Sequence, residues 1–164
     1  MKPHILLCAM VISSFAACTN INQYAGGNAA LIPIQCGTEI RDPQGKQFKV
    51  YSSINEVDGS FTAAGGGCPN LAVYRIKPGL RHLKVIPNLD NDSDPTLLFA
   101  AVDVSAELRP SEKYELLTSF SGAKITIQVR EMTTGKIVGA GESSEIRQSS
   151  KGNAALQAVP LLKR

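Results

Sequence analysis

The sequence predicts an all-β domain, an antiparallel β-sandwich that follows an export signal and a flexible tether. Short apolar segments rich in Val, Ile and Tyr recur between turn residues, which is the spacing of sandwiches and barrels. Residues 124–130 alternate apolar and polar side chains with a period of two, so one face of this segment is expected to be buried. No convincing amphipathic helix separates the segments, which argues against a parallel α/β sheet.

Residues 1–17 are predicted to be a lipoprotein signal peptide. Lys2, the apolar run Ile5 to Ile12 and the small residues before Cys18 form an export signal. The run is shorter than the roughly 20 apolar residues of a membrane-spanning helix, and no later segment reaches that length. Phe15-Ala16-Ala17-Cys18 resembles the processing box in which bacteria acylate the cysteine, although that box usually has Leu in the place of Phe15. Ordinary signal cleavage and a buried cysteine are the alternatives.

The same resemblance predicts where the protein resides. Acylation of Cys18 implies a multi-chain anchor that holds a membrane far more tightly than one myristoyl group. Thr19 stands where the lipoprotein sorting pattern has Asp for retention in the inner membrane, so the resemblance implies the outer membrane of a Gram-negative cell, with the domain facing the periplasm. Thr19 to Ala30 is polar and carries glycines, which predicts that residues 18–30 are the lipidated cysteine and a flexible tether.

The first candidate strands lie in the middle of the chain. Gln47 to Ile54 is followed by Leu71 to Ile76 and by Leu80 to Ile86. Lys77-Pro78-Gly79 separates the last two segments. Because a Pro-Gly pair suits a tight turn, these two segments are predicted to form a hairpin.

Further strands follow in the second half of the chain. Leu97 to Leu108 is largely apolar and predicts a strand buried on both faces, with Asp103 as an awkward charge. Tyr114 to Phe120 continues the pattern. Lys124 to Arg130 is the alternating segment, and a Thr-Thr-Gly-Lys turn leads from it into Ile137-Val138-Gly139, which is predicted to be its hairpin partner.

These segments predict one sandwich domain of immunoglobulin-like or transthyretin-like type over residues 31–141. Removing residues 1–17 from 164 leaves 147, enough for a single domain with its own core. Residues 142–164 are predicted to be a C-terminal tail. The tail is either a mobile arm or a segment that docks through its last apolar residues, Leu156, Val159, Leu161 and Leu162.

Composition and cysteine count limit the function classes. The net charge of +3 comes from basic residues scattered among acidic ones, which does not indicate nucleic-acid binding, and the absence of Trp argues against sugar-stacking platforms. Cys8 leaves with the signal and Cys18 takes lipid, so Cys36 and Cys68 are predicted to form a disulfide in an oxidising compartment. Closing this loop of about 33 residues stabilises the fold by roughly 3–4 kcal/mol.

One acidic segment resembles the beginning of a calcium loop. Asp90, Asp92 and Asp94 alternate as oxygen ligands do in such loops, but Pro95 replaces the required Gly and Ala101 replaces the closing Glu. The segment is therefore predicted to be a solvated hairpin loop, with weak divalent-cation binding as the alternative. No cofactor is implied.

No catalytic residue is assigned from the sequence. His82 is the only histidine left after processing, and its alternation with Leu83 and Val85 predicts a polar side chain on a strand. No serine lies in a Gly-x-Ser-x-Gly elbow. An enzyme would have to build its chemistry from carboxylates such as Asp58, Asp103 or Glu131, without histidine.

Several short motifs occur in a recognisable order. They are Tyr24-Ala25-Gly26, Val57-Asp58-Gly59, the segment Val73 to His82 and Lys113-Tyr114-Glu115. Together they resemble a diffuse group of small proteobacterial outer-membrane lipoproteins, which have a Tyr-x-Gly start, a strand ending in Val-Asp-Gly, a PGxH hairpin and a strand entered at Tyr. The resemblance covers most of the mature chain and supports the anchored fold, and it implies no active site to carry over to this chain. The pair Cys36 and Cys68 is not part of that pattern.

These observations predict a non-enzymatic envelope lipoprotein, anchored to the membrane by lipid, whose sandwich is a structural or protein-interaction module for another envelope component. The alternative is a periplasmic module that binds a glycan, lipid or peptide in a concave pocket. An envelope hydrolase, or an inhibitor of one, is the third hypothesis.

Overall fold

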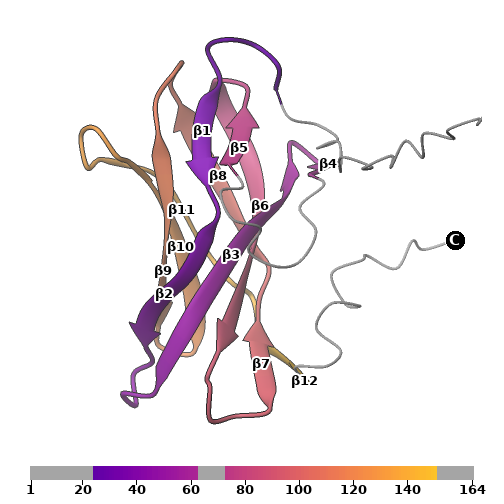
Figure 1. The fold of residues 1–164 in the computed structure, drawn as a ribbon, viewed down its shortest axis with the longest axis vertical. Helices are drawn as coiled ribbons and strands as arrows, with labels where there is room; N and C mark the ends of the chain where they lie inside the picture. The colour runs from indigo at the N-terminus through magenta and orange to yellow at the C-terminus, as the bar shows by residue number, and fades with distance from the viewer. Residues whose placement is uncertain (1–23, 63–72, 151–164) are drawn as a thin grey trace, which may run out of the picture.

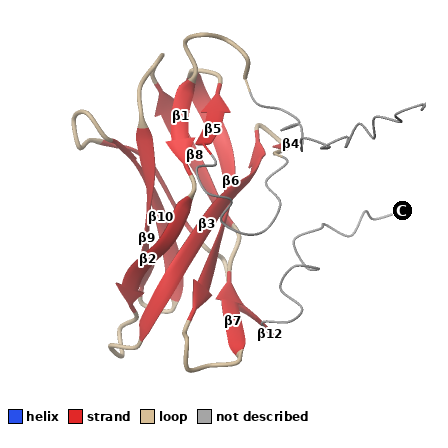
Figure 2. Cartoon of the chain, viewed as in Figure 1, coloured by secondary structure: helices blue, strands red, loops and turns tan. Residues whose placement is uncertain are grey.

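The computed structural model describes residues 24–62 and 73–150, and within these ranges every regular element is a β-strand. Twelve strands form a ten-stranded sheet and a two-stranded sheet, and all strand pairs in them are antiparallel (Figure 2). The predicted all-β, antiparallel class is thus confirmed. Among the residues so described there is no helix long and apolar enough to cross a membrane.

The large sheet curls on itself. Its main strands, in spatial order, are β2 (Gln35–Arg41), β3 (Gln47–Val57), β6 (Gly79–Asp90), β8 (Val102–Leu108), β11 (Ile137–Glu142), β10 (Lys124–Glu131) and β9 (Tyr114–Ser121). Strand β9 returns to contact β2, so the sheet is nearly closed (Figure 1). Three short strands extend it: β4 (Ser60–Phe61) beside β3, β7 (Thr96–Phe99) beside β6, and β12 (Arg147–Ser150) beside β7.

The small sheet pairs β1 (Ala30–Pro33) with β5 (Val73–Ile76) and covers one end of the large sheet. Its buried side chains Ala30, Ile32, Tyr74 and Ile76 share one apolar cluster with side chains of β3, β6, β8, β9 and β10. Together with the curled large sheet, this packing gives a β-sandwich or barrel-like fold.

A buried polar group separates this cluster from a second one. Along β3, Ser52 lies between Val50 of the second cluster and Ile54 of the first. The Ser52 hydroxyl lies 3.0 Å from the hydroxyl of Thr118 on β9, which donates to Oε1 of Gln35 at 2.7 Å. These bonds avoid the penalty of about 1–3 kcal/mol for each buried polar group left unpaired.

Several predicted strands lie where the sequence placed them. Gln47 to Ile54 begins β3, Tyr114 to Phe120 lies within β9, and Lys124 to Arg130 lies within β10. The apolar side chains of β10, Ile125, Ile127 and Val129, are 0% exposed, as the alternation predicts. The hairpin of β10 with β11 is also confirmed.

The predicted hairpin around Lys77-Pro78-Gly79 is wrong. Strand β5 pairs with β1, whereas β6 pairs with β3, β7 and β8. Gly79 has a φ of +108°, which glycine adopts easily, and the turn carries the chain from the small sheet to the large one. Turn chemistry predicts that the chain reverses direction, but it does not determine which strands then pair.

The single strand predicted for Leu97 to Leu108, buried on both faces, is also wrong. Strand β8 alternates buried and exposed residues, with Asp103 on the exposed side, and residues 100 and 101 separate it from β7. Both strands nevertheless lie along β6 in one register. The gap lies opposite Pro87, whose carbonyl accepts from Ala100 N–H at 3.3 Å but whose nitrogen has no hydrogen to return the second bond.

Both predicted boundaries of the domain need correction. Tyr24 to Ala30, assigned to the tether, lies on the fold: the Tyr24 N–H donates to the Arg75 carbonyl at 2.8 Å, and Ala29 and Ala30 are buried. At the other end, β12 belongs to the sheet instead of to a tail. In both cases main-chain pairing, which composition does not reveal, binds a polar segment to the domain. Residues 18–23 of the tether and 151–164 of the tail lie outside the described residues.

Candidate functional site

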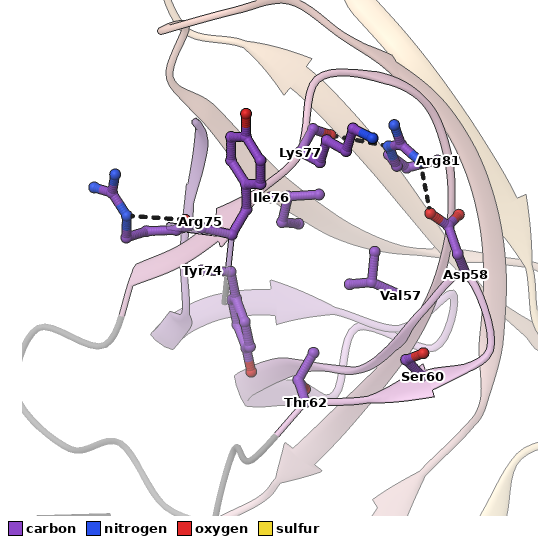
Figure 3. A pocket seen from close by; sticks show the side chains of 10 residues that line it. Val57, Asp58, Ser60, Thr62, Tyr74, Arg75, Ile76, Lys77 and Arg81 are labelled. Atoms are coloured by element: carbon purple, nitrogen blue, oxygen red, sulfur yellow. Dashed lines mark hydrogen bonds and ion pairs between the residues drawn. The ribbon is translucent and has the colours of Figure 1, made fainter. Parts of the chain in front are cut away.

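A groove of about 300 Å³ opens between the β3–β4 hairpin, strand β5 and the turn that follows β5 (Figure 3). Apolar side chains of Val57, Tyr74 and Ile76 line it, together with charged groups on its rim. The charged side chains are Asp58, Arg75, Lys77 and Arg81, so cations outnumber anions here. The remaining lining residues are Tyr24, Ser60 and Thr62.

The right-hand rim in Figure 3 is built by a network centred on Asp58. Asp58 and Gly59 have φ values of +49° and +77°, as expected for the Asp-Gly turn of a two-residue hairpin. This turn aims the carboxylate at β6, where Oδ1 accepts from the His82 N–H at 2.9 Å and Oδ2 from the Arg81 guanidinium at 2.8 Å. The Val-Asp-Gly motif and the segment that carries His82 are therefore bound to each other.

Arg81 connects this network to the turn after β5. Its guanidinium donates to the carbonyl of Lys77 at 2.9 Å and to that of Pro78 at 2.7 Å. Burial raises the pKa of the Asp58 carboxyl, but the His82 N–H and the Arg81 guanidinium outweigh burial and hold the pKa below its ordinary value. At neutral pH the Asp58 carboxylate is therefore ionised, and hydrogen bonds join it through Arg81 to the turn after β5.

The floor of the groove depends on Tyr74. Its hydroxyl accepts from the Ile54 N–H at 3.0 Å, next to the position where the register of β3 against β6 shifts between Ile54 and Glu56. In Figure 3 the Tyr74 side chain points toward Thr62, whose hydroxyl donates to the Ile54 carbonyl. Burial of Tyr74 raises its pKa to about 12, so the phenol stays neutral.

The opposite rim is formed by Tyr24 and Arg75. The Arg75 guanidinium donates to the carbonyls of Tyr24 at 3.4 Å and Gly26 at 3.0 Å, which holds the N-terminal segment against β5. Lys77 differs from both arginines because its side chain is exposed, and among the described residues no carboxylate lies within ion-pair distance of Lys77 or of Arg75. Within the described part of the groove, Lys77 and Arg75 are therefore cations without a carboxylate partner, and Lys77 is the more exposed of the two.

The carboxylates considered for catalysis do not come together. Asp58 lies in the β3–β4 turn, Asp103 points outward from β8, and Glu131 is 1% exposed at the end of β10. Glu131 accepts from the Thr134 hydroxyl at 2.6 Å and lies 3.5 Å from the Arg109 guanidinium. Across the described ranges, no hydrogen bond or ion pair links any two of these three carboxylates.

His82 lies on the outward side of the sheet and does not line the groove. Its Nδ1 lies 2.8 Å from the hydroxyl of Ser105, its cross-strand partner on β8. This is the contact expected of two neighbouring polar side chains on an exposed face.

The acidic loop lies between β6 and β7, as the sequence predicts for Asp90 to Asp94. Lysines approach its carboxylates: Lys49 lies 2.7 Å from Asp92, and Lys46 lies 3.2 Å from Asp94. The Thr96 hydroxyl and N–H, together with Lys46, lower the pKa of Asp94 to about 2. In the part of the chain that the structure describes, no three His, Cys, Asp or Glu side chains are grouped to hold a metal ion.

The predicted covalent sites lie mostly outside the described residues. Cys18, the predicted lipidation site, and Cys68 are not among them. Cys36 lies on β2 and is disulfide-bonded, and its pairing with Cys68 stays a prediction.

Sequence reasoning did not identify the groove. It singled out Asp58 only as a possible catalytic carboxylate, and it did not connect Asp58 with Arg81. Asp58 lies in the Val-Asp-Gly motif, and Arg81 lies in the segment Val73 to His82. The occurrence of both motifs in the same resemblance is the sequence signal that could have suggested a contact between the two segments. The pairing itself depends on the register of β3 against β6, in which Val57 lies opposite Leu83.

Comparison of the chain with protein-family models, with curated proteins and with solved structures finds no match.

Proposed function

We propose that this chain is a lipid-anchored, non-enzymatic interaction module of the bacterial envelope, and that the groove beside Asp58 and Arg81 is its binding site. The observation that supports the proposal most directly is that the rims of the groove are held in place by hydrogen bonds. Two sequence motifs and the N-terminal segment are hydrogen-bonded into its rims, which gives a preorganised surface with an apolar floor.

The chemistry of the groove supports binding more than catalysis. Asp58 and Arg81 neutralise each other, the Tyr74 phenol has a raised pKa, and His82 is not among the groove residues. A general acid or base needs a pKa near the working pH and a position beside the substrate. Asp58 and Tyr74 lack the first property, and His82 lacks the second.

The anchor is tested by labelling cells with a fatty-acid analogue. We expect the wild-type chain to carry the label on a mature N-terminus at Cys18, and the Cys18→Ala variant to lose it. A Cys18→Ala protein that labels as strongly as the wild type contradicts the anchor.

The binding site is tested with a photo-crosslinking side chain at Ser60 in the groove, and with the same group at Gln44 in the β2–β3 turn as the control. In intact envelopes we expect a discrete adduct from position 60 that is absent from position 44. Equal, diffuse labelling from both positions contradicts a binding site in the groove.

A second candidate function is capture of a free glycan, lipid or peptide, which the concave shape favours. The volume of about 300 Å³ is at the lower limit of ligand pockets. It therefore suits a headgroup or a single side chain better than a whole oligosaccharide.

A further inference from the structure

We propose that the groove end of the sandwich rests on the membrane that anchors the chain, and that Lys77 and its cationic neighbours contact the phosphates of anionic lipids there. This inference rests on the proposed function, because it needs the lipid at Cys18. It names the occupant of the groove: the phosphate of a lipid headgroup in the same membrane.

The two ends of the molecule differ in their available charge. We call the groove end the set of turns β3–β4, β5–β6, β8–β9 and β10–β11, which lie in the upper part of Figure 1, with β10–β11 at the left and β3–β4 at the right. Its cationic side chains come from segments far apart in the sequence, and they are Arg75, Lys77, Arg81, Arg109, Lys113 and Lys136.

Against these six cations, the groove end carries four carboxylates, Asp58, Glu107, Glu112 and Glu131. Asp58 is bound by Arg81, Glu131 by Thr134 and Arg109, and Glu112 by the Thr133 hydroxyl at 2.9 Å. Among the described residues, no carboxylate lies within ion-pair distance of Lys77, Lys113 or Lys136. With six cations against four carboxylates, the groove end has a net charge of +2.

The far end is the opposite case. It consists of the β2–β3, β6–β7 and β9–β10 turns, at the bottom of Figure 1. Its lysines are paired: Lys46 with Asp94, Lys49 with Asp92 and Lys124 with Glu142. Among the described residues Arg41 at this end has no carboxylate within ion-pair distance, but it is followed by Asp42, so the far end offers little attraction for an anionic surface.

The length of the connection to the anchor selects the groove end as the end near the membrane. Tyr24, which lines the groove, is six residues after Cys18, so the intervening chain spans at most about 22 Å even when fully extended. The far end lies beyond β3, whose 11 residues measure about 36 Å at the usual rise of a strand. A lipid at Cys18 thus holds the positive end, and not the far end, close to the headgroups.

Electrostatics then orients the domain. Each Lys or Arg near an anionic lipid surface strengthens the attraction about five-fold, and a short tether keeps the lipid phosphates at high local concentration. The short segment between Cys18 and Tyr24 and the positive charge therefore both bring the groove end to the membrane.

The experiment uses the mature lipidated chain reconstituted in vesicles. Because the chain has no Trp, a single tryptophan reports one position. Phe61→Trp places it on β4 next to the groove, at a residue 49% exposed, and Gln44→Trp places it at the far end. Lipids that carry a nitroxide on the headgroup, in vesicles of phosphatidylcholine with or without phosphatidylglycerol, quench a tryptophan that lies at the headgroups.

We expect quenching of the tryptophan at position 61 only in vesicles with phosphatidylglycerol, and none at position 44. Lys77→Glu in the Phe61→Trp chain should lower the contact at least five-fold, Lys77→Gln less so, and the matched charge reversal Arg41→Glu at the far end should not change it. Far-ultraviolet circular dichroism checks that each variant is folded.

Equal quenching at both positions, quenching without phosphatidylglycerol, or insensitivity to Lys77→Glu overturns the inference. An adduct from position 60 to a protein instead of a lipid also overturns it, while the proposed interaction module stands. A chain that is not acylated contradicts the proposed function itself, which the labelling experiment detects separately.

Discussion

At the scale of single residues, the fold depends on polar groups that join segments distant in the sequence. Asp58 is the clearest case, because one carboxylate binds the backbone of His82 and the guanidinium of Arg81. Tyr114 is another: it is 0% exposed at the start of β9, and its hydroxyl accepts from the Arg109 N–H at 2.6 Å, much as the tyrosine corner of immunoglobulin-type sandwiches does. Neither contact is visible from residue type alone.

Two substitutions of Asp58 should separate the contribution of its charge to stability from that of its hydrogen bonds and backbone conformation. Asp58→Asn keeps an acceptor and tolerates the positive φ but loses the ion pair, and we expect a loss of about 1 kcal/mol in unfolding free energy, since the pair is partly exposed. Asp58→Ala loses both bonds and adds strain, for about 2 kcal/mol. Urea unfolding measures both, with Asp103→Ala on the exposed face of β8 as the control. An Asp58→Ala protein as stable as Asp103→Ala contradicts this role.

The raised pKa of Tyr74 predicts that the unfolding free energy falls at alkaline pH. Burial raises its pKa from 10.0 to about 12 in the fold, so its contribution is complete below pH 10 and is lost as pH rises from 10 to 12. The loss is on the order of 2 kcal/mol. Urea midpoints across this range should fall for the wild type and fall less steeply for Tyr74→Phe. Tyr114 also has a raised pKa from burial, so some slope remains. An unchanged slope in Tyr74→Phe contradicts the assignment.

At the scale of elements, strand pairing differs most from what the sequence predicts. Strands β3, β9 and β10 follow their apolar patterns, because a sheet with one buried face imposes alternation on each strand. The pairing of β5 with β1 has no such signal, because it joins segments more than 40 residues apart. Likewise, Pro87 on β6 interrupts a neighbouring strand that looks continuous in its own sequence.

Strand β11 approaches β8 closely, and Gly139 makes this possible. A Cβ at this position would lie 2.5 Å from the Ser105 carbonyl oxygen and 2.7 Å from the Ala106 Cβ. We expect Gly139→Ala to lower the unfolding free energy by about 1–3 kcal/mol, because the two strands must move apart.

Gly27→Ala is the matched control for Gly139→Ala, since nothing lies within 4 Å of its Cβ position. Thermal unfolding of the two variants measures the difference. Equal melting temperatures contradict the close approach of β11 to β8.

At the scale of the whole molecule, the disulfide is expected to connect the large sheet to the segment of the chain between β4 and β5. Cys36 is disulfide-bonded on β2, and the predicted partner is Cys68, between β4 and β5 in the sequence. A disulfide lowers the conformational entropy of the unfolded chain. Cys36→Ser removes this restriction and should lower the unfolding free energy by roughly 3–4 kcal/mol. Mass spectrometry of the unreduced, digested protein identifies the partner, and a peptide joining Cys36 to any cysteine other than Cys68 contradicts the pairing.

The charge distribution is also a property of the whole molecule. In the sequence, the cations are scattered among acidic residues and indicate no patch. Folding brings Lys77, Lys113 and Lys136 to one end, while the acidic β6–β7 loop lies at the other beside Lys46 and Lys49. The resulting polarity arises because antiparallel strands bring alternate turns to the same end.

The sequence by itself determined the all-β class and most strand positions, because alternation and turn residues are local properties of the chain, while the lipid anchor at Cys18 stays a prediction. It did not determine the partners of β5, the break opposite Pro87, the true limits of the domain or the groove. Tertiary structure decided these, because each depends on backbone hydrogen bonds and charges from segments that are distant in the chain. The residues of one segment do not specify which other segment will pair with it.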